Sequence, residues 1–430
     1  MNKSTDLPVY DHPPRDARVR ALLCEDSAGR MHIIAPEKAL VDPDLIGQTT
    51  GRTLRSLPPA QEEPLCAIPG FYGLPTVIHS GLLKANALAL ATETPGRYVR
   101  VTGAELHQMS RSVRSFEIQF GERLTPIPSV TDDDQQQIRC AVDKFTTRRI
   151  EARLDETLHI PPLPEAARQI ISLQQNPDFD LSDLVQIIET DPGLTARLMG
   201  WANSALYAPP TPAKTVNDAI MRVLGVDIVF NMALGMAIGA SLNLPSTEVA
   251  GANPYWLTAV YNAATMEALA QHIESPDPPN PGTCYLVGLL ANFGTLVAGH
   301  VFPPQYEKIC RLQEANPQIH HAHIDQHVLS VNRETIAATL LELWELPDEV
   351  TTAMRFQSVK AYRGEHHTYV RLLQLSHVLS AHAQLGHRTL EGCDAKIEFG
   401  DLNLDWRGVE GVIETVFDSK AELGELARAF

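Results

Sequence analysis

The sequence predicts a multidomain α+β and all-α protein, in which a small domain of mixed α/β content is followed by a larger all-helical domain. Three observations support this fold class. At 430 residues the chain is long enough for two or three domains. Residues 1–109 are rich in Pro and β-branched residues and contain short strand-like runs. From about residue 156, apolar residues recur at three- and four-residue intervals almost to the end, which is typical of amphipathic helices.

Composition and charge limit the classes of function. The formal net charge of −17 argues against a general nucleic-acid or anionic-membrane surface, because both need a basic face. The six cysteines are scattered without CxxC spacing, and the first residues lack the apolar core of a signal peptide. The longest apolar stretches, around 232–244 and 286–299, are shorter than a bilayer span requires. We therefore expect a cytoplasmic protein without membrane contact.

The first predicted domain contains strands joined by glycine and proline turns. Residues 20–25 and 31–34 flank Asp26-Ser-Ala-Gly29, which predicts a β-hairpin. Residues 76–78 and 97–101 are two further strand candidates. After this domain, acidic residues followed by apolar residues at helical spacing predict a connecting helix over 110–155.

The helical part shows several boundaries. Asp191-Pro192 separates two helices, since Pro disfavours helical geometry in the residue before it but suits a first turn. Asn217 is a candidate N-cap for a helix over 219–224, and Gly225 stands where a left-handed C-terminal cap is expected. The last segment, residues 391–430, has mixed composition and ends in a short acidic helix; we call it the C-terminal extension. The predicted segments are therefore 1–109, 110–155, 156–390 and 391–430.

Several spaced motifs between about 155 and 385 resemble the HDOD family. They are Ile160-Pro-Pro-Leu-Pro164, residues 187–198 (IIETDPGLTARL), Ala202-Asn-Ser-Ala-Leu-Tyr207 and the helix before Gly225. The resemblance implies an all-helical fold related to HD phosphohydrolases. It also implies a family that is common in bacterial signalling proteins and usually without demonstrated catalysis.

The resemblance also shows which metal ligands the chain lacks. Residues 286–297 (LVGLLANFGTLV) fall where HD phosphohydrolases carry adjacent His and Asp ligands. Carried over one at a time, the family's ligand positions fall at Thr258, Ala291, Asn292, Arg333, Gln357, Ser358 and near His377. Only His377 still offers a good donor atom, whereas a catalytic binuclear site needs several carboxylate and imidazole donors together. We therefore expect no bound metal and no metal-dependent hydrolysis.

The N-terminal region resembles the YbaK/prolyl-tRNA editing family of aminoacyl-tRNA deacylases over about residues 10–108. The matching residues are Cys66-Ala-Ile-Pro-Gly-Phe-Tyr-Gly73, residues 74–79 (LPTVIH) and the strand that begins at Arg20. Glycine-rich turns in that family expose backbone N–H groups that hold an ester carbonyl or a carboxylate. The resemblance makes the following residues candidates for ligand binding: Arg20, Ile68, Pro69, Gly70, Gly73 and His79.

Two of these candidates differ from the editing family's pattern. The Lys that is linked to activity in many members falls at Arg20, and the Asp at the strand end falls at His79. Arg keeps the positive charge but does not exchange a proton near pH 7. Orientation of a phosphate or carboxylate would therefore survive, whereas lysine-specific chemistry would not.

These observations predict a non-catalytic bacterial signal-transduction protein that needs no cofactor. The editing-like domain is expected to sense a small anionic or aminoacyl-like ligand, and the HDOD domain to present a surface to a protein partner. The main alternative is an aminoacyl-tRNA deacylase, with the backbone of residues 70–73 holding an oxyanion and Arg20 positioning the tRNA substrate. The missing Lys and the acidic balance count against it, since tRNA binding needs cationic contacts. Residual phosphohydrolase activity on a cyclic nucleotide is a third reading, which the lost ligands disfavour.

Overall fold

The computed structural model describes residues 17–57, 74–91, 98–110, 115–118, 163–240, 254–384 and 395–428, apart from Pro177, Ala205 and Ala361, together with residues 13, 14 and 242. The chain divides into two compact units. The first unit comprises Met1–Ser129, Ser246–Ala252 and Pro304–Ser330, and the second comprises Val130–Pro245, Asn253–Pro303 and Val331–Phe430. The segment Pro304–Ser330 thus groups with the N-terminal region, although helical sequence surrounds it on both sides.

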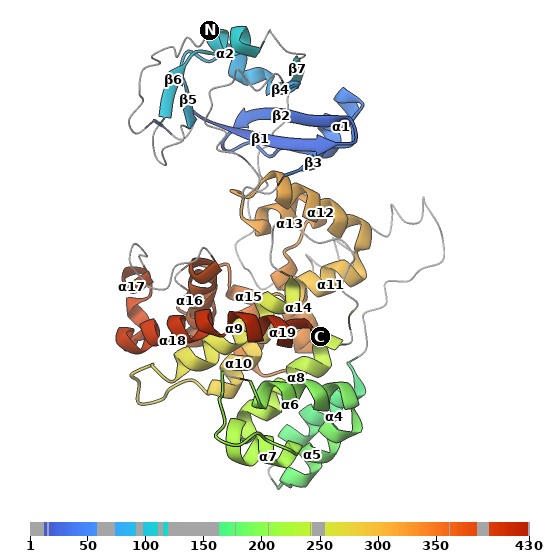
Figure 1. The fold of residues 1–430 in the computed structure, drawn as a ribbon, viewed down its shortest axis with the longest axis vertical. Helices are drawn as coiled ribbons and strands as arrows, with labels where there is room; N and C mark the ends of the chain where they lie inside the picture. The colour runs from blue at the N-terminus through green and yellow to red at the C-terminus, as the bar shows by residue number, and fades with distance from the viewer. Residues whose placement is uncertain are drawn as a thin grey trace, which may run out of the picture. The chain divides into compact units, whose positions relative to one another are not determined.

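A mixed β-sheet forms the centre of the first unit (Figure 1). Its order is β6-β5-β1-β2-β4-β7, and β3 pairs with the end of β1. The β1–β2 hairpin confirms the expected one, and its turn needs a glycine because Gly29 has φ of +113°. The strands are β1 (Arg18–Asp26), β2 (Gly29–Pro36), β3 (Arg55–Ser56), β4 (Thr76–His79), β5 (Leu88–Ala91), β6 (Tyr98–Val101) and β7 (Ser115–Ile118).

The sheet continues past the boundary expected at residue 109. β7 pairs in parallel with β4, from Thr76 opposite Ser115 to His79 opposite Ile118. Residues 115–118, within the segment expected to be a connecting helix, therefore form a strand. Their backbone pairs with β4 at the sheet edge. The remainder of that expected helix, residues 119–155, lies outside the described residues.

Each face of the sheet buries its own apolar cluster. One face packs Leu22, Met31 and Ile33 against α1 (Pro43–Thr50) and includes Ala315 from far along the chain. The other face packs Ile34 and Ile78 against the 3₁₀ helix η4 (Ser80–Lys84) and α2 (Gly103–Ser110). Alternate residues of β2 point to opposite faces, as strand geometry requires.

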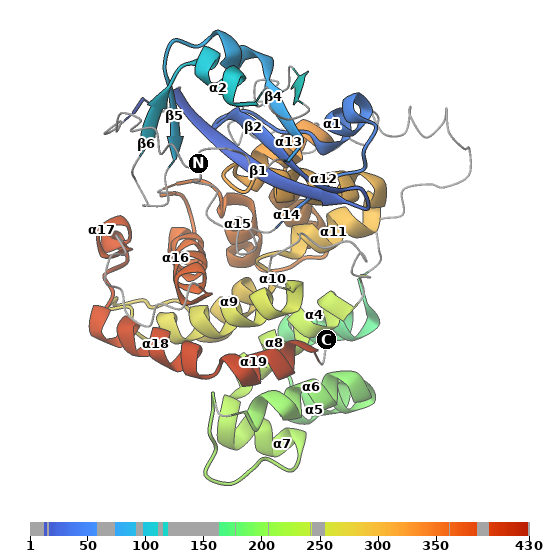
Figure 2. The same cartoon turned by 45° about the horizontal axis from the view of Figure 1, so that its top comes forward.

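The rest of the described chain is helical (Figures 1 and 2). A π-helical turn, Ala219–Leu224, lies between α7 and α8. The helices are α4 (Glu165–Gln174), α5 (Leu181–Thr190), α6 (Pro192–Ala202), α7 (Val216–Asp218), α8 (Val226–Ala240), α9 (Tyr255–Ala270), α10 (Pro281–Leu290), α11 (Phe293–Val301), α12 (Pro303–Ala315), α13 (His321–Leu329), α14 (Arg333–Leu343), α15 (Asp348–Phe356), α16 (His367–Gln384), α17 (Ala395–Glu398), the 3₁₀ helix η6 (Gly400–Leu402), α18 (Trp406–Asp418) and α19 (Lys420–Arg428).

The predicted helix boundaries are partly right. Asp191 ends α5 and caps α6, accepting hydrogen bonds from the backbone N–H groups of Gly193 at 2.9 Å and Leu194 at 3.1 Å. The expected cap at Asn217 is wrong, because the Thr215 hydroxyl accepts from the Asp218 backbone N–H and Asn217 lies within α7. Gly225 adopts φ of +86° and ψ of +161°, an extended conformation open to glycine alone and different from the expected left-handed cap.

The stretch Pro281–Val301 is long and apolar enough to cross a bilayer by length and composition, and it is the one such stretch among the described residues. It comprises α10 and α11, and 78% of its most apolar window is buried inside the protein. Buried core helices of globular proteins pass the same test, so composition alone does not indicate a membrane span here.

Glycine allows α9 and α10 to approach each other closely. A methyl group at Gly288 would lie 2.5 Å from the Asn262 carbonyl oxygen and 2.6 Å from the backbone nitrogen of Ala263. Backbone atoms of a packed helix do not move aside cheaply. Gly288 therefore fixes the distance between the two central helices of the second unit.

Gly288→Ala is expected to lower the free energy of unfolding by about 2 kcal/mol, since it forces α9 and α10 apart. Urea unfolding followed by tryptophan fluorescence measures this loss. Gly411→Ala is the matched control: it lies within α18 with no atom within 4 Å of the added carbon, and it should stabilise the helix by roughly 0.5–1 kcal/mol. Equal losses in the two variants would contradict the close-approach explanation.

Candidate functional site

The positions at which the resemblance places metal ligands lie on or beside neighbouring helices of the second unit. α9 packs on α10, α11 on α14, α14 on α15, α15 on α16, and α16 on α9. The elements therefore form a continuous set of packed helices. On these elements lie Thr258 in α9, Ala291 and Asn292 between α10 and α11, Arg333 at the start of α14, Gln357 and Ser358 after α15, and His377 in α16.

Three of the side chains at these positions form hydrogen bonds with other protein groups. The Arg333 guanidinium donates to the Thr295 hydroxyl at 3.2 Å. The Ser358 hydroxyl donates to the carboxylate of Glu334, a buried residue next to Arg333, also at 3.2 Å. The Gln357 amide donates to the Met354 carbonyl at 3.1 Å. Hydrogen bonding within the protein thus occupies positions that would otherwise serve as a ligand shell.

The donor set does not fit the divalent metal that HD phosphohydrolases carry. Ala291 has no donor atom, and Asn292, Gln357, Ser358 and Thr258 offer neutral oxygens only. Arg333 adds a permanent positive charge that repels a divalent cation. Among the described residues, no group of three or more His, Cys, Asp or Glu side chains could hold a metal ion. We therefore derive no metal-dependent step at this site.

A buried arginine connects the C-terminal extension to the Gln357–Ser358 segment. The Gln374 amide of α16 donates to the backbone carbonyls of Gln357 at 3.1 Å and Val359 at 2.8 Å. Arg371, whose side chain is 2% exposed, donates to the Gln374 side chain at 2.8 Å and forms an ion pair with Asp401 at 3.0 Å. The Gln357–Ser358 segment, where the resemblance places a His-His pair, is thereby linked to residues near the end of the chain.

A buried carboxyl group, that of Glu267, lies in the last turn of α9. The Tyr207 hydroxyl donates to the Glu267 carboxylate at 2.5 Å, and the Trp201 indole donates to the Tyr207 hydroxyl at 3.4 Å. Burial raises the pKa of Glu267 to about 7, although the hydrogen bond from Tyr207 opposes this shift. Burial, and then the charge of Glu267, also raises the pKa of Cys284 and Tyr285 on α10. The sequence signal for Glu267 was an acid within an otherwise apolar helix, which the motif-based prediction missed.

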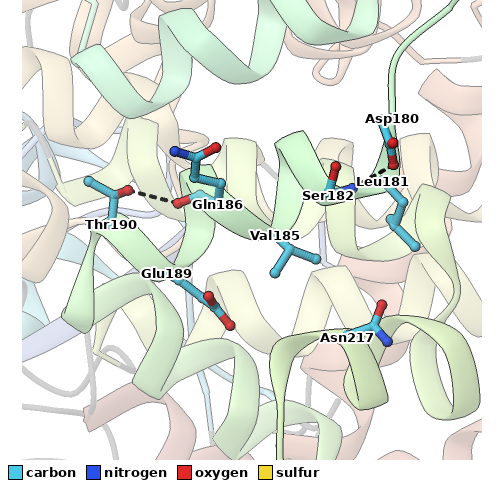
Figure 3. A pocket seen from close by; sticks show the side chains of 8 residues that line it. All are labelled: Asp180, Leu181, Ser182, Val185, Gln186, Glu189, Thr190 and Asn217. Carbon is cyan, nitrogen blue, oxygen red and sulfur yellow. Dashed lines mark hydrogen bonds between the residues drawn. The ribbon is translucent and has the colours of Figure 1, made fainter.

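A surface groove of about 680 Å³ runs along α5 (Figure 3). Its ionisable lining groups are the carboxylates of Asp180 and Glu189, and Leu181 and Val185 supply its apolar surface. The Asp180 side chain already accepts a hydrogen bond from the Ser182 backbone N–H at 3.0 Å, as the N-cap of α5. The lining contains no His, Cys or Lys beside a hydroxyl, so the groove offers hydrogen-bond acceptors but no nucleophile with a base.

The ligand-binding candidates of the first unit are only partly described. Arg20 donates to the carbonyls of Ala315 at 2.7 Å and Ala39 at 3.2 Å, and to the side chains of Asn316 at 2.5 Å and Gln318 at 3.0 Å. Its guanidinium thus serves as a bridge between the sheet and α12. The His79 ring accepts from the Gly81 backbone N–H at 3.1 Å and caps η4. The other candidates, Ile68, Pro69, Gly70 and Gly73, lie outside the described residues.

Comparison with known proteins identifies the helical region. Residues 160–359 match the HDOD domain model. A protein of Marinobacter aquaeolei VT8, provisionally described as a signal transduction protein, has a similar structure with a TM-score of 0.81 and 30% identity, covering 98% of this chain and 96% of that one. Because that similarity covers both units, the combination of a sheet unit and a helical unit is shared.

More distant solved structures share the helical fold. A protein of Shewanella amazonensis SB2B, provisionally described as a phosphohydrolase, has a TM-score of 0.53 and 18% identity over 68% of this chain and 98% of its own. An HDOD domain protein with unknown function from Geobacter sulfurreducens has a TM-score of 0.51 at the same identity and the same coverage. An uncharacterized protein of Treponema pallidum (strain Nichols) is 28% identical over 211 residues, or 49% of this chain and 40% of that relative's length. The editing-family resemblance gains no support from these comparisons, and the structure shows only a small mixed sheet with helices there.

Proposed function

We propose that this chain, which carries an HDOD domain at residues 160–359, is a regulatory signal-transduction protein that acts by binding and performs no hydrolysis. The content of the seven lost-ligand positions carries the proposal. Five of them hold side chains that are poor or absent donors for a divalent metal, and a sixth, Arg333, places a cation among them. The scaffold of a hydrolase family is kept, whereas its chemistry is removed.

The proposed mechanism is coupled recognition in the cytoplasm. The sheet unit senses a small anionic or aminoacyl-like ligand, and the helical unit presents a surface to a protein partner of the signalling pathway. This requires two conformations with different affinities for the ligand, because a ligand that binds both equally shifts nothing. Equal ligand affinity in the presence and absence of the partner would count against the coupling.

A hydrolysis assay tests the non-catalytic role. Purified full-length protein with Mn²⁺ is expected to cleave bis(p-nitrophenyl) phosphate and cyclic dinucleotides no faster than Mn²⁺ alone. The His377→Ala variant should behave identically, since no group of three or more His, Cys, Asp or Glu side chains that could hold a metal ion occurs among the described residues. A metal-dependent rate that disappears in His377→Ala would show that a catalytic site remains and would overturn the proposal.

A further inference from the structure

The helices α12 and α13 lie within the residues that match the HDOD domain model, but they group structurally with the sheet unit. Residues 160–359 match one continuous domain model, but Pro304–Ser330 groups with the sheet while the helices on either side group with the second unit. We call this segment the inserted hairpin. Figure 2 shows α12 and α13 beside β1.

A buried amide fastens the inserted hairpin to the sheet unit. Asn316, fully buried just after α12, accepts from the Val41 backbone N–H at 2.7 Å and donates to the Val41 carbonyl at 2.8 Å. It also donates to the Leu312 carbonyl at 2.7 Å and accepts from Arg20 at 2.5 Å. The side chain thus pairs with Val41 as a neighbouring strand would, and each of its donors and acceptors has a partner.

Further polar contacts surround this amide. Arg20 on β1 donates to the Ala315 carbonyl, and Gln318 donates to the Glu37 carbonyl at 3.1 Å. Ala315 belongs to the apolar cluster on the same face of the sheet. At the rim, the following ion pairs join α12 to the region around α1 and β3: Arg311–Asp44 at 2.8 Å, Lys308–Asp42 at 3.5 Å and Arg55–Glu314 at 3.8 Å. The rim pairs are solvent-screened, so the buried contacts hold the hairpin.

Both ends of the inserted hairpin lead directly into the helices of the lost metal site. Phe302 alone separates α11 from α12. At the other end, Ser330 terminates α13 in a left-handed conformation with φ of +64°, and α14 begins three residues later at Arg333. α11 and α14 touch each other, since a methyl group at Gly294 would lie 2.3 Å from the Arg333 carbonyl oxygen. The hairpin is therefore joined to both helices by connections of only one and three residues.

From this connectivity we propose that the inserted hairpin is the element that transmits the state of the sheet unit to the helices of the lost metal site. The sheet unit holds the hairpin through Asn316, Arg20 and Gln318, and the hairpin ends determine how α11 and α14 meet around Asn292 and Arg333. The proposal rests on the proposed regulatory function and names its coupling element. It requires neither a known ligand nor a known partner to be tested.

Hydrogen–deuterium exchange on the full-length protein tests the coupling. Gln318→Ala removes the hydrogen bonds to Arg20 and Glu37, and is expected to speed exchange about fivefold in α12 and α13 and also in α11 and the first turns of α14. The factor corresponds to about 1 kcal/mol for the two exposed hydrogen bonds together, or about 0.5 kcal/mol each, with 1.4 kcal/mol for a factor of ten. Asn316→Ala should speed exchange in the same four helices more strongly. If Asn316→Ala fails to fold, Gln318→Ala alone tests the proposal.

Ile78→Val is the matched control, because it removes one methyl group from the opposite face of the sheet at a similar cost in stability. It should leave exchange in α11 and α14 unchanged. The coupling is overturned if the Gln318 variant changes the hairpin alone, or if Ile78→Val speeds exchange in α14 equally. Either result would leave the absence of hydrolysis, tested separately above, unaffected.

Discussion

Replacement of Glu267 by glutamine is expected to raise the free energy of unfolding at pH 8 by about 3 kcal/mol and to flatten its dependence on pH between 5 and 8. Burial in α9 raises the pKa of this carboxyl group to about 7 from an ordinary value of 4.5. Folding therefore favours the protonated form, and an ionised Glu267 destabilises the native state. Glutamine keeps the shape and an acceptor for the Tyr207 hydroxyl but carries no charge.

The sign follows from proton binding. Between pH 4.5 and about 7 the folded protein binds more protons at Glu267 than the unfolded chain does, so stability falls as the pH rises through this window. Below pH 4.5 the native state is fully stabilised by a protonated Glu267, and above about pH 7 this stabilisation is lost. At pH 5 the variant and the wild type should therefore be similar in stability, and they should diverge toward pH 8.

Urea unfolding at several pH values, followed by tryptophan fluorescence, measures the effect. Glu414→Gln, an exposed carboxyl group on α18, serves as the control and should leave the pH profile unchanged. A Glu267→Gln variant that is less stable than the wild type at pH 8 would show that the charge is better stabilised than its burial indicates.

Arg371→Met is expected to lower the free energy of unfolding by about 3 kcal/mol and to release the C-terminal extension from α16. The guanidinium binds Asp401 through two hydrogen bonds, at 3.0 and 3.2 Å, and donates to the Glu398 carbonyl at 2.5 Å. It also stacks over Phe399, with 4.4 Å between the guanidinium carbon and the ring centroid. Without Arg371, Asp401 keeps the exposed Arg363 but loses its buried partner, and the Glu398 carbonyl loses a charged donor, so breaking this pair from the arginine side is costly.

Arg363 provides an internal control for this prediction. It contacts the same Asp401 carboxylate at 3.0 Å, but its side chain is 53% exposed. Arg363→Gln should therefore cost less than about 1 kcal/mol. Limited proteolysis should cut near residue 395 faster in Arg371→Met than in Arg363→Gln. Equal cleavage and equal unfolding midpoints in the two variants would mean that the buried pair does not hold the extension.

Elements whose conformation is set by neighbouring residues could be predicted from the sequence. The β1–β2 hairpin follows from two apolar runs around a glycine turn, and the α5–α6 boundary follows from Asp191-Pro192. The cap at Thr215 was missed because a Thr and an Asn two residues apart satisfy the same pattern. β7 was missed because its pairing partner, β4, lies almost forty residues earlier and no short-range signal specifies that pairing.

The candidate site shows the same limit. Family motifs placed the lost ligands on the chain, and the structure puts them on packed helices. The contacts that the side chains at these positions make, such as Ser358 with Glu334, join residues more than twenty positions apart and have no sequence signature. Likewise, the helical spacing of α12 predicts a helix but does not say that Ala315 and Asn316 pack against the sheet.

Metal binding tests the central claim, that the HDOD scaffold here has lost its metal site, most directly. Isothermal titration of Mn²⁺ into the metal-stripped full-length protein is expected to show no binding tighter than about 1 mM, equivalent to about 4 kcal/mol. Metal analysis of the protein as purified should agree. One Mn²⁺ per chain, bound with micromolar affinity and lost in His377→Ala, would contradict the account and restore a catalytic reading of this site.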